Sequence, residues 1–132
     1  NPTKVINAMC PINNSDFNNP TIPKVVTRLD NRLLYGSRVG IPVTKDLLFS
    51  KAKKQVCIYA YPKQSLIDFS SINKKTPLEK IEYNEYLRVL ENGYTIQGVI
   101  VESDTVSVDT DEDLKYVRKL MSADKLFEVY KP

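Results

Sequence analysis

The segment from Gln55 to Tyr61 is nearly continuous in apolar and aromatic residues. A strand with one face in water alternates apolar and polar residues, whereas a strand covered on both faces does not. The segment is therefore predicted to be a central strand of a sheet that is covered on both sides. This requirement favours a layered fold, in which helices pack against a sheet.

The remaining pattern supplies the other elements of such a fold. Further strands are predicted for 5–9, 24–28, 32–35, 94–101 and 105–108, and helices for 63–69, 77–92 and 111–121. The strands on either side of the turn at 29–31 form a predicted hairpin over 24–36. We expect a loop for 13–23, and either one helical turn or a mobile flap for 47–49. The order of elements predicts one α/β domain.

Both longer helices begin with a recognisable cap. Thr76 precedes Pro77, and Glu79 follows three residues after the cap, which is the spacing of a capping box. Thr110 and Asp113 repeat this spacing before the last helix. These signals predict where the two helices start.

Composition narrows the function. The 132 residues carry a net charge of +3 with scattered basic residues, which is not typical of a nucleic-acid-binding surface. No apolar run is long enough to span a bilayer, so we expect a soluble, cytoplasmic protein. Cys10 and Cys57 lie in apolar runs and are predicted to be buried thiols. The absence of histidine excludes imidazole bases and nucleophile–histidine pairs, and a divalent cation held by carboxylates fits the remaining chemistry.

The most acidic turn of the chain runs from Ser107 to Leu114. Asp109 follows a short apolar segment, where a carboxylate can face a ligand crevice and bind a metal. The same pattern also serves ordinary helix capping and compensation of the helix dipole. The spacing alone leaves both interpretations open for Asp109.

Two further groups of residues have a structural and a functional interpretation. Three glutamates spaced by three form one predicted acidic flank of a helix: Glu79, Glu82 and Glu85. In the structural interpretation this flank is solvated and Glu85 pairs with Arg88. In the functional interpretation it recognises a hydroxyl-rich ligand. Arg38 either binds a carboxylate or phosphate or pairs with an acid across the sheet. The sequence does not separate these alternatives.

Six blocks carry a resemblance to a known family: 20–26, 34–42, 58–61, 76–82, 85–90 and 108–114. Their order and spacing, from Ala8 to Met121, resemble those of the 3-deoxy-manno-octulosonate cytidylyltransferases, or CMP-Kdo synthetases. The resemblance covers the C-terminal half of such an enzyme. It implies a partial nucleotide-diphospho-sugar-transferase-like (Rossmann-like) layered fold with a β-hairpin, lacking the N-terminal CTP-binding strands.

The resemblance also implies chemistry. Such enzymes use Mg²⁺ to couple CTP to the sugar acid Kdo, giving pyrophosphate and CMP-Kdo for lipopolysaccharide synthesis. It implies that Asp109 is a Mg²⁺ ligand and that Arg38, Gln55, Tyr59 and Glu85 lie at the sugar-acid site. Gln55 stands where the family typically has His.

Other departures concern the detail of the site and the extent of the match. Lys45 stands near a family Arg, and Tyr86 replaces a family Gln. With no complete catalytic set, we expect the chain to be inactive alone. The hairpin region of the family contributes to its dimer, so the resemblance implies a homodimer. We expect no nucleic-acid or membrane partners. The alternatives are a non-catalytic sugar-binding or dimerisation module and a cytidylyltransferase for a related sugar acid, such as amino-Kdo or an acylneuraminate.

Overall fold

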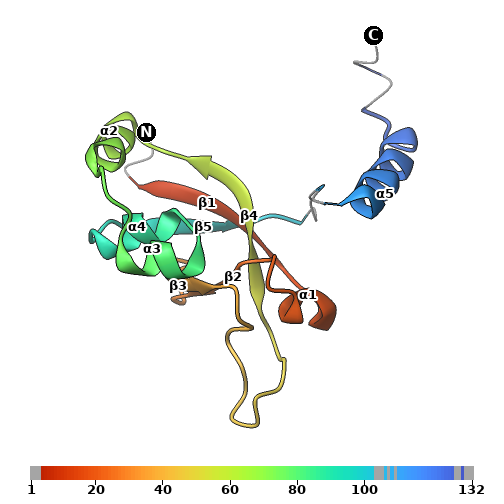
Figure 1. Cartoon of the computed structure of the whole chain (residues 1–132), viewed down its shortest axis with the longest axis horizontal. Helices are drawn as coiled ribbons and strands as arrows, with labels where there is room; N and C mark the ends of the chain where they lie inside the picture. The colour runs from red at the N-terminus through yellow and green to blue at the C-terminus, as the bar shows by residue number, and fades with distance from the viewer. Residues whose placement is uncertain (1–3, 103–105, 107, 109, 127–128, 130–132) are drawn as a thin grey trace.

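The computed structural model describes residues 4–102, 106, 108, 110–126 and 129, and it contains one five-stranded mixed sheet (Figure 1). The strands lie in the order β3-β2-β4-β1-β5. Their bounds are β1 Val5–Pro11, β2 Lys24–Thr27, β3 Leu33–Ser37, β4 Lys53–Ala60 and β5 Ile96–Ile100. β1 is parallel to β5 and antiparallel to β4, so the predicted central strand does occupy the middle of the sheet.

Only the first half of β4 is covered as the sequence predicts. Val56 is buried, but Cys57 and Ile58 are exposed, so the prediction of two buried thiols holds for Cys10 and is wrong for Cys57. A bulge lies at this point of β4, since Ala8 alone separates two β1 pairs whose partners in β4 are four residues apart. The Asn7 amide fills the bulge by donating to the carbonyls of Val56 (2.9 Å) and Ile58 (3.2 Å).

The predicted hairpin is confirmed as β2 and β3, which pair antiparallel. Its turn closes with a hydrogen bond from the Arg28 amide to the Arg32 carbonyl, and Asn31 takes a positive φ of 63°. Asparagine tolerates this left-handed conformation better than most residues. The turn residues recognised in the sequence therefore set the hairpin.

Two segments between strands differ from expectation. Within the predicted loop 13–23 lies a short helix, α1 (Asn14–Asn18), capped by the Asn13 side chain and holding Phe17 in contact with Phe49. One apolar residue gives no helical period, which is why the sequence did not indicate this helix. The helical turn considered for 47–49 is wrong, because Val43 bridges Phe49 in extended form.

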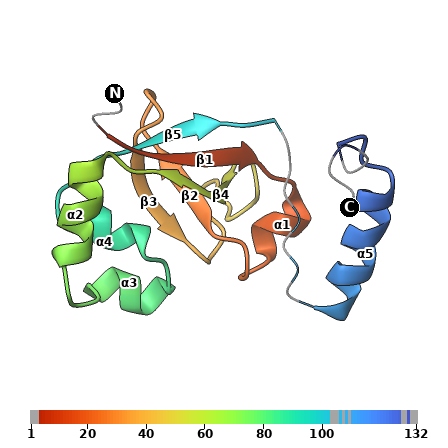
Figure 2. The ribbon, with the colours of Figure 1, turned by 90° about the horizontal axis from the view of Figure 1, so that it is seen from above.

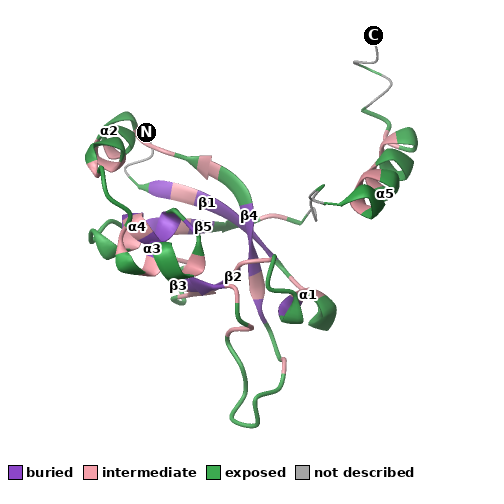
Figure 3. Ribbon diagram, viewed as in Figure 1, coloured by how far each residue is buried: buried purple, intermediate pink, exposed green. Residues whose placement is uncertain are grey.

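Three helices group on one side of the molecule: α2 (Lys63–Ser71), α3 (Pro77–Glu82) and α4 (Tyr86–Glu91), as Figure 2 shows. Of these, α4 packs on the sheet, because its buried side chains Tyr86, Leu87 and Val89 join the main core. The sheet contributes the other buried members of that core, which are Val5, Met9, Val25, Leu33 and Ile96. Buried residues concentrate in these elements (Figure 3). The architecture is the predicted α/β layered fold.

The last helix, α5 (Asp111–Ser122), starts at the predicted cap, where the Thr110 hydroxyl accepts from the Asp113 amide at 3.1 Å. None of its residues is buried, and the helix stands apart from the sheet in both views. The strand expected over 105–108 lies largely outside the described residues. No helix within the described ranges has the length and apolar character needed to cross a membrane.

Candidate functional site

The single helix predicted over 77–92 is wrong, because the chain breaks between α3 and α4. Tyr83 takes a left-handed conformation (φ 50°, ψ 45°), and Asn84 turns inward and is 5% exposed. The carbonyls of Glu82 and Tyr83 accept hydrogen bonds from Arg38, and the Asn84 amide donates to Gln55, which offsets part of the helical hydrogen bonding that is lost. We call residues 82–85 the α3–α4 junction.

Arg38 is fixed against this junction by backbone carbonyls. Its Nε donates to the Glu82 carbonyl (2.8 Å) and its Nη2 to the Tyr83 carbonyl (3.3 Å). Its Nη1 donates to the carbonyls of Pro20 and Thr21 at 3.2 and 3.3 Å. A guanidinium has five N–H groups, so these contacts leave one N–H on Nη2 for another acceptor. Arg38 therefore presents its remaining donor from a fixed position.

The Glu82 carboxylate completes this attachment. It accepts from the Ser37 hydroxyl (2.7 Å), the Arg38 amide (2.8 Å) and the Tyr35 hydroxyl (3.1 Å). Burial alone would raise the pKa of Glu82, but these hydrogen bonds lower it below its ordinary value. Glu82 stays ionised and ties the end of β3 to the end of α3.

Lys24 lies beneath the same region and was not singled out from the sequence. Its ammonium group donates to the carbonyls of Arg38 (2.5 Å) and Asn19 (2.8 Å), and the residue is fully buried. Burial and the nearby Arg38 charge lower the pKa of Lys24. The sequence feature that could have indicated Lys24 is its position between Pro23 and two valines of a strand. Lys24 fixes the backbone that carries Arg38.

A second polar group joins the junction to the middle of β4. The Asn84 amide donates to Gln55 Oε1 at 2.7 Å, and the Gln55 amide donates to the Tyr59 hydroxyl. Burial, with a smaller effect from the Glu85 charge, raises the pKa of Tyr59 far above its ordinary value. Tyr59 is therefore a neutral phenol at any physiological pH. Asn84, set within a helical pattern, gave no signal of this role.

Glu85 is exposed at the start of α4, and its charge acts on both Tyr59 and Tyr61. The predicted Glu85–Arg88 pair is wrong, because Arg88 binds Glu79 instead. The three glutamates do not form one acidic flank: Glu79 binds Arg88, Glu82 accepts from residues at the end of β3, and Glu85 is exposed. The fold leaves Glu85 as an exposed carboxylate, next in sequence to Asn84, whose amide contacts Gln55.

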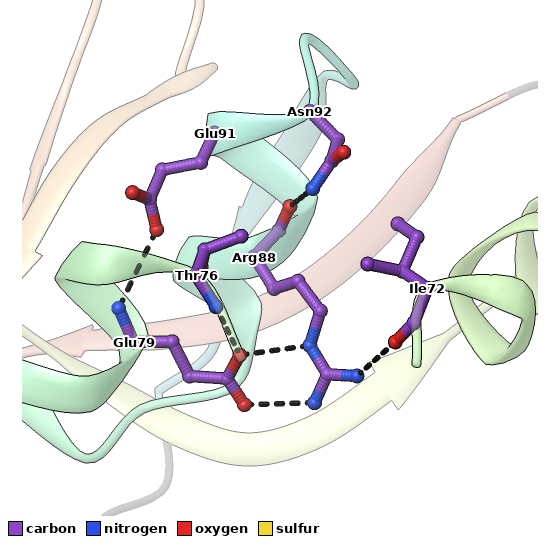
Figure 4. A network of polar contacts seen from close by, with 6 residues as sticks. All are labelled: Ile72, Thr76, Glu79, Arg88, Glu91 and Asn92. Atoms are coloured by element: carbon purple, nitrogen blue, oxygen red, sulfur yellow. Dashed lines mark hydrogen bonds and ion pairs between the residues drawn. The ribbon is translucent and has the colours of Figure 1, made fainter. Parts of the chain in front are cut away.

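Glu79 and Arg88 are the centre of a structural contact at the other end of the helix pair (Figure 4). Arg88 Nε and Nη2 donate to the two carboxylate oxygens of Glu79 at 2.8 and 2.7 Å. Nη1 donates to the Ile72 carbonyl (3.1 Å), and the guanidinium lies 4.5 Å from the centre of the Phe69 ring. The Thr76 amide also donates to Glu79, as a capping box requires. We call this network the helix brace.

Two buried polar atoms near the junction find no hydrogen-bond partner among the described residues. They are Asn84 Oδ1 and the Tyr86 hydroxyl. Tyr86 is fully buried, and its hydroxyl occupies the space next to Gly36 where a Cβ would otherwise lie. Such groups are uncommon in folded proteins. Asn7 Oδ1 and Thr76 Oγ1 are two further examples elsewhere in the fold.

The predicted site residues are therefore distributed as follows. Gln55, Tyr59 and Glu85 come together at the junction, and Arg38 is bound to its neighbouring residues. Asp109 lies outside the residues that the structure describes, and Lys45 is exposed on the excursion between β3 and β4. Within the described ranges, no three His, Cys, Asp or Glu side chains meet as a metal site would require.

Comparison with known proteins supports the resemblance seen in the sequence. No family model matches the chain. Curated proteins described as 3-deoxy-manno-octulosonate cytidylyltransferase are similar: that of Acidobacterium capsulatum is 40% identical over 112 residues, covering 84% of this chain and 45% of the relative. That of Solibacter usitatus is 39% identical, covering 79% of this chain and 41% of the relative.

Solved structures agree. A structure of CMP:2-keto-3-deoxy-manno-octonic acid synthetase complexed with CTP superposes with a TM-score of 0.84 and 30% identity, covering 93% of this chain and 51% of that one. The chain spans about half the length of the curated relatives it matches. The resemblance is confirmed: this chain corresponds in sequence and fold to about half of a 3-deoxy-manno-octulosonate cytidylyltransferase, or CMP-Kdo synthetase.

Proposed function

We propose that the chain forms the sugar-acid-binding part of a cytidylyltransferase that joins Kdo to CTP, releasing pyrophosphate and giving CMP-Kdo for lipopolysaccharide synthesis. The observation that carries the proposal is the meeting of Gln55, Tyr59 and Glu85 at the α3–α4 junction, in a chain whose relatives bear this name. Arg38 is attached to the same junction. We assign the chain's C-terminal position in the enzyme and a homodimer on the resemblance alone, and its cytoplasmic location on the expectation from the sequence.

The chemistry of the junction suits a sugar acid. Such a ligand presents a carboxylate, which needs hydrogen-bond donors, and several hydroxyls, which can donate to a carboxylate. Arg38 offers one N–H and a positive charge, and neutral Tyr59 offers an O–H. Glu85 offers an exposed acceptor. Donors for the acid and an acceptor for a hydroxyl are thus presented by adjacent elements.

The described residues do not make a Mg²⁺ site by themselves, so we assign no step of the reaction to the metal. Asp109 is the carboxylate that we propose binds Mg²⁺ in the enzyme, on the resemblance. A bound Mg²⁺ would neutralise phosphate charge.

In the proposed reaction the anomeric hydroxyl of Kdo attacks the α-phosphate of CTP, and the bond to pyrophosphate breaks. The described residues contribute positioning of the sugar acid, which is a large part of catalysis in such transfers. We therefore expect this chain alone to bind Kdo but to release no pyrophosphate from CTP. Turnover by the chain alone would contradict this division of roles.

Binding of Kdo is the direct test. Titration of the ¹⁵N-labelled chain should give saturable shifts that map to the junction, and Tyr59→Phe or Glu85→Gln should each weaken binding about tenfold through loss of one hydrogen bond. Tyr116→Phe and Glu112→Gln, exposed on α5, are the matched controls and should bind as the unmodified chain does. Absence of binding, or equal binding by all four variants, would refute the proposal. Tighter binding of amino-Kdo or an acylneuraminate would identify the related sugar acid instead.

A further inference from the structure

Asn84, Gln55 and Tyr59 form a chain of hydrogen bonds with a defined direction. Asn84 donates to the Gln55 carbonyl, and the Gln55 amide nitrogen donates to the Tyr59 oxygen. Asn84 and Gln55 are 5% and 8% exposed, so water does not compete freely for these groups. The oxygen and nitrogen of a primary amide point in different directions, so with its oxygen toward Asn84 the Gln55 amide turns its nitrogen toward Tyr59. The orientation of Asn84 therefore sets the orientation of Gln55.

The Tyr59 hydroxyl is consequently an acceptor on its Gln55 side. Its own proton must point elsewhere, and no hydrogen bond from this proton to another described residue is present. Because Tyr59 is neutral, that proton is always available for donation. The exposed Glu85 carboxylate and the remaining Arg38 N–H are presented by the same junction.

We infer that Asn84 is a positioning residue: by holding the Gln55 amide in one orientation, it directs the Tyr59 hydroxyl to donate to the bound sugar acid. The identity of the ligand rests on the proposed function, whereas the hydrogen-bond chain does not. Neither the comparisons nor the sequence pattern assigns a role to Asn84.

The energetics of Asn84 support a role beyond folding. Its Oδ1 is buried with no partner among the described residues, which destabilises the folded state. The break that brings it inward also places Tyr83 at a positive φ. An apolar side chain at 84 would avoid the unpaired carbonyl. What asparagine supplies, and an apolar residue cannot, is the N–H that orients Gln55.

The test uses the full chain with tyrosine labelled at ¹³Cζ, because this carbon reports the hydrogen bonding of its hydroxyl. The Tyr59 signal is identified as the one that is lost in Tyr59→Phe. Asn84→Leu should shift this signal and leave the Tyr116 signal in place. It should also weaken Kdo binding about fivefold to tenfold through misdirection of one hydrogen bond. Asn18→Leu, an exposed asparagine of α1, is the control and should change neither measurement.

Gln55→Leu provides an independent route should the Asn84 variant fold poorly, and it should shift the same signal and weaken binding equally. Combining the two should weaken binding no further than either alone, because both act through one chain of contacts. An unmoved Tyr59 signal, additive losses, or a moved signal with unchanged Kdo affinity would each overturn the inference. Failure of the unmodified chain to bind Kdo would refute the proposed function, while the Tyr59 signal would still decide whether the chain of hydrogen bonds exists.

Discussion

Where α3 begins and α4 ends, Glu79 and Arg88 are paired through two hydrogen bonds, and the third nitrogen of Arg88 reaches the Ile72 carbonyl. Where α3 ends and α4 begins, Asn84 and Tyr86 each bury a polar atom without a partner among the described residues, and at the start of α3 the Thr76 hydroxyl oxygen does the same. The two ends belong to the same helix pair and lie a few residues apart. The helix brace is built on one buried ion pair, whereas the α3–α4 junction is built on hydrogen bonds from Arg38 and Asn84 and holds no ion pair among the described residues.

The brace predicts the largest effect on stability. Arg88→Met removes the partner of Glu79, which is 3% exposed, and leaves a carboxylate buried without its cation. Breaking a buried pair in this way costs about 3–5 kcal/mol of unfolding free energy. Urea denaturation followed by circular dichroism measures the loss.

Arg118→Met, on the exposed side of α5, is the matched control, and it should change the unfolding free energy by no more than about 0.5 kcal/mol. A loss below about 1 kcal/mol for Arg88→Met would place the pair among weak surface contacts. The distinction between the two ends would then fail.

The junction predicts smaller changes in unfolding free energy, and one substitution there, Tyr86→Phe, should not destabilise the chain. An added Cβ at Gly36 would lie 1.2 Å from the Tyr86 hydroxyl and 2.5 Å from its Cζ, so Gly36→Ala should cost about 1–3 kcal/mol through overpacking. Tyr86→Phe alone should be neutral or stabilising, because it deletes a buried hydroxyl that lacks a partner among the described residues. In the double variant, Tyr86→Phe should recover part of the loss.

Tyr83→Phe is the control for removing a hydroxyl, since Tyr83 is 75% exposed, and it should leave stability unchanged. The same urea titrations measure all four variants. A clear loss of stability in Tyr86→Phe alone would mean that this hydroxyl has a partner, and the contrast with the brace would weaken.

The sequence predicted the brace's cap but not the junction, for a physical reason. The Thr76–Glu79 signal is local, and short-range signals specify helix starts. Leu78, Ile81, Leu87 and Leu90 keep a helical period across the break, although Ile81 is 71% exposed. The side chains that bind the polar groups of the break are those of Arg38 and Gln55, which lie far away in the sequence. No local pattern contains that information.

The same limit applies to the predicted site residues. Gln55, Tyr59 and Glu85 were predicted from the resemblance; the fold brings Gln55 and Tyr59 into contact, and the role of all three in binding stays a prediction. Asn84 lies inside an expected helix, where a polar residue is ordinarily solvated. Arg88 was paired with Glu85 by their spacing of three, but the break changes the direction of α4 and presents Glu79 instead. Spacing rules assume a continuous helix, and here the helix is not continuous.

Acid should have the smallest effect and should act on both ends through different carboxylates. The pKa of Glu82 at the junction and of Glu91 beside the brace are both lowered: burial opposes this, and hydrogen bonds to the carboxylates outweigh it. A carboxylate whose pKa is lower in the folded chain contributes stability that is present above its ordinary pKa of 4.5 and is lost as the pH falls through the lowered value. The urea concentration at the unfolding midpoint should therefore decrease when the pH is lowered below about 4.5.

Glu82→Gln and Glu91→Gln separate the two ends. Each variant should be less stable than the unmodified chain at neutral pH and should approach it in acid, because the lost interaction is already absent there. Glu112→Gln, exposed on α5, should follow the unmodified curve.

The ends differ in what the carboxylate binds: Glu82 accepts from Arg38, whereas Glu91 accepts from the amides of Leu78 and Glu79. Glu82→Gln should therefore also weaken Kdo binding at neutral pH, and Glu91→Gln should not; equal effects on binding would remove the functional distinction between junction and brace.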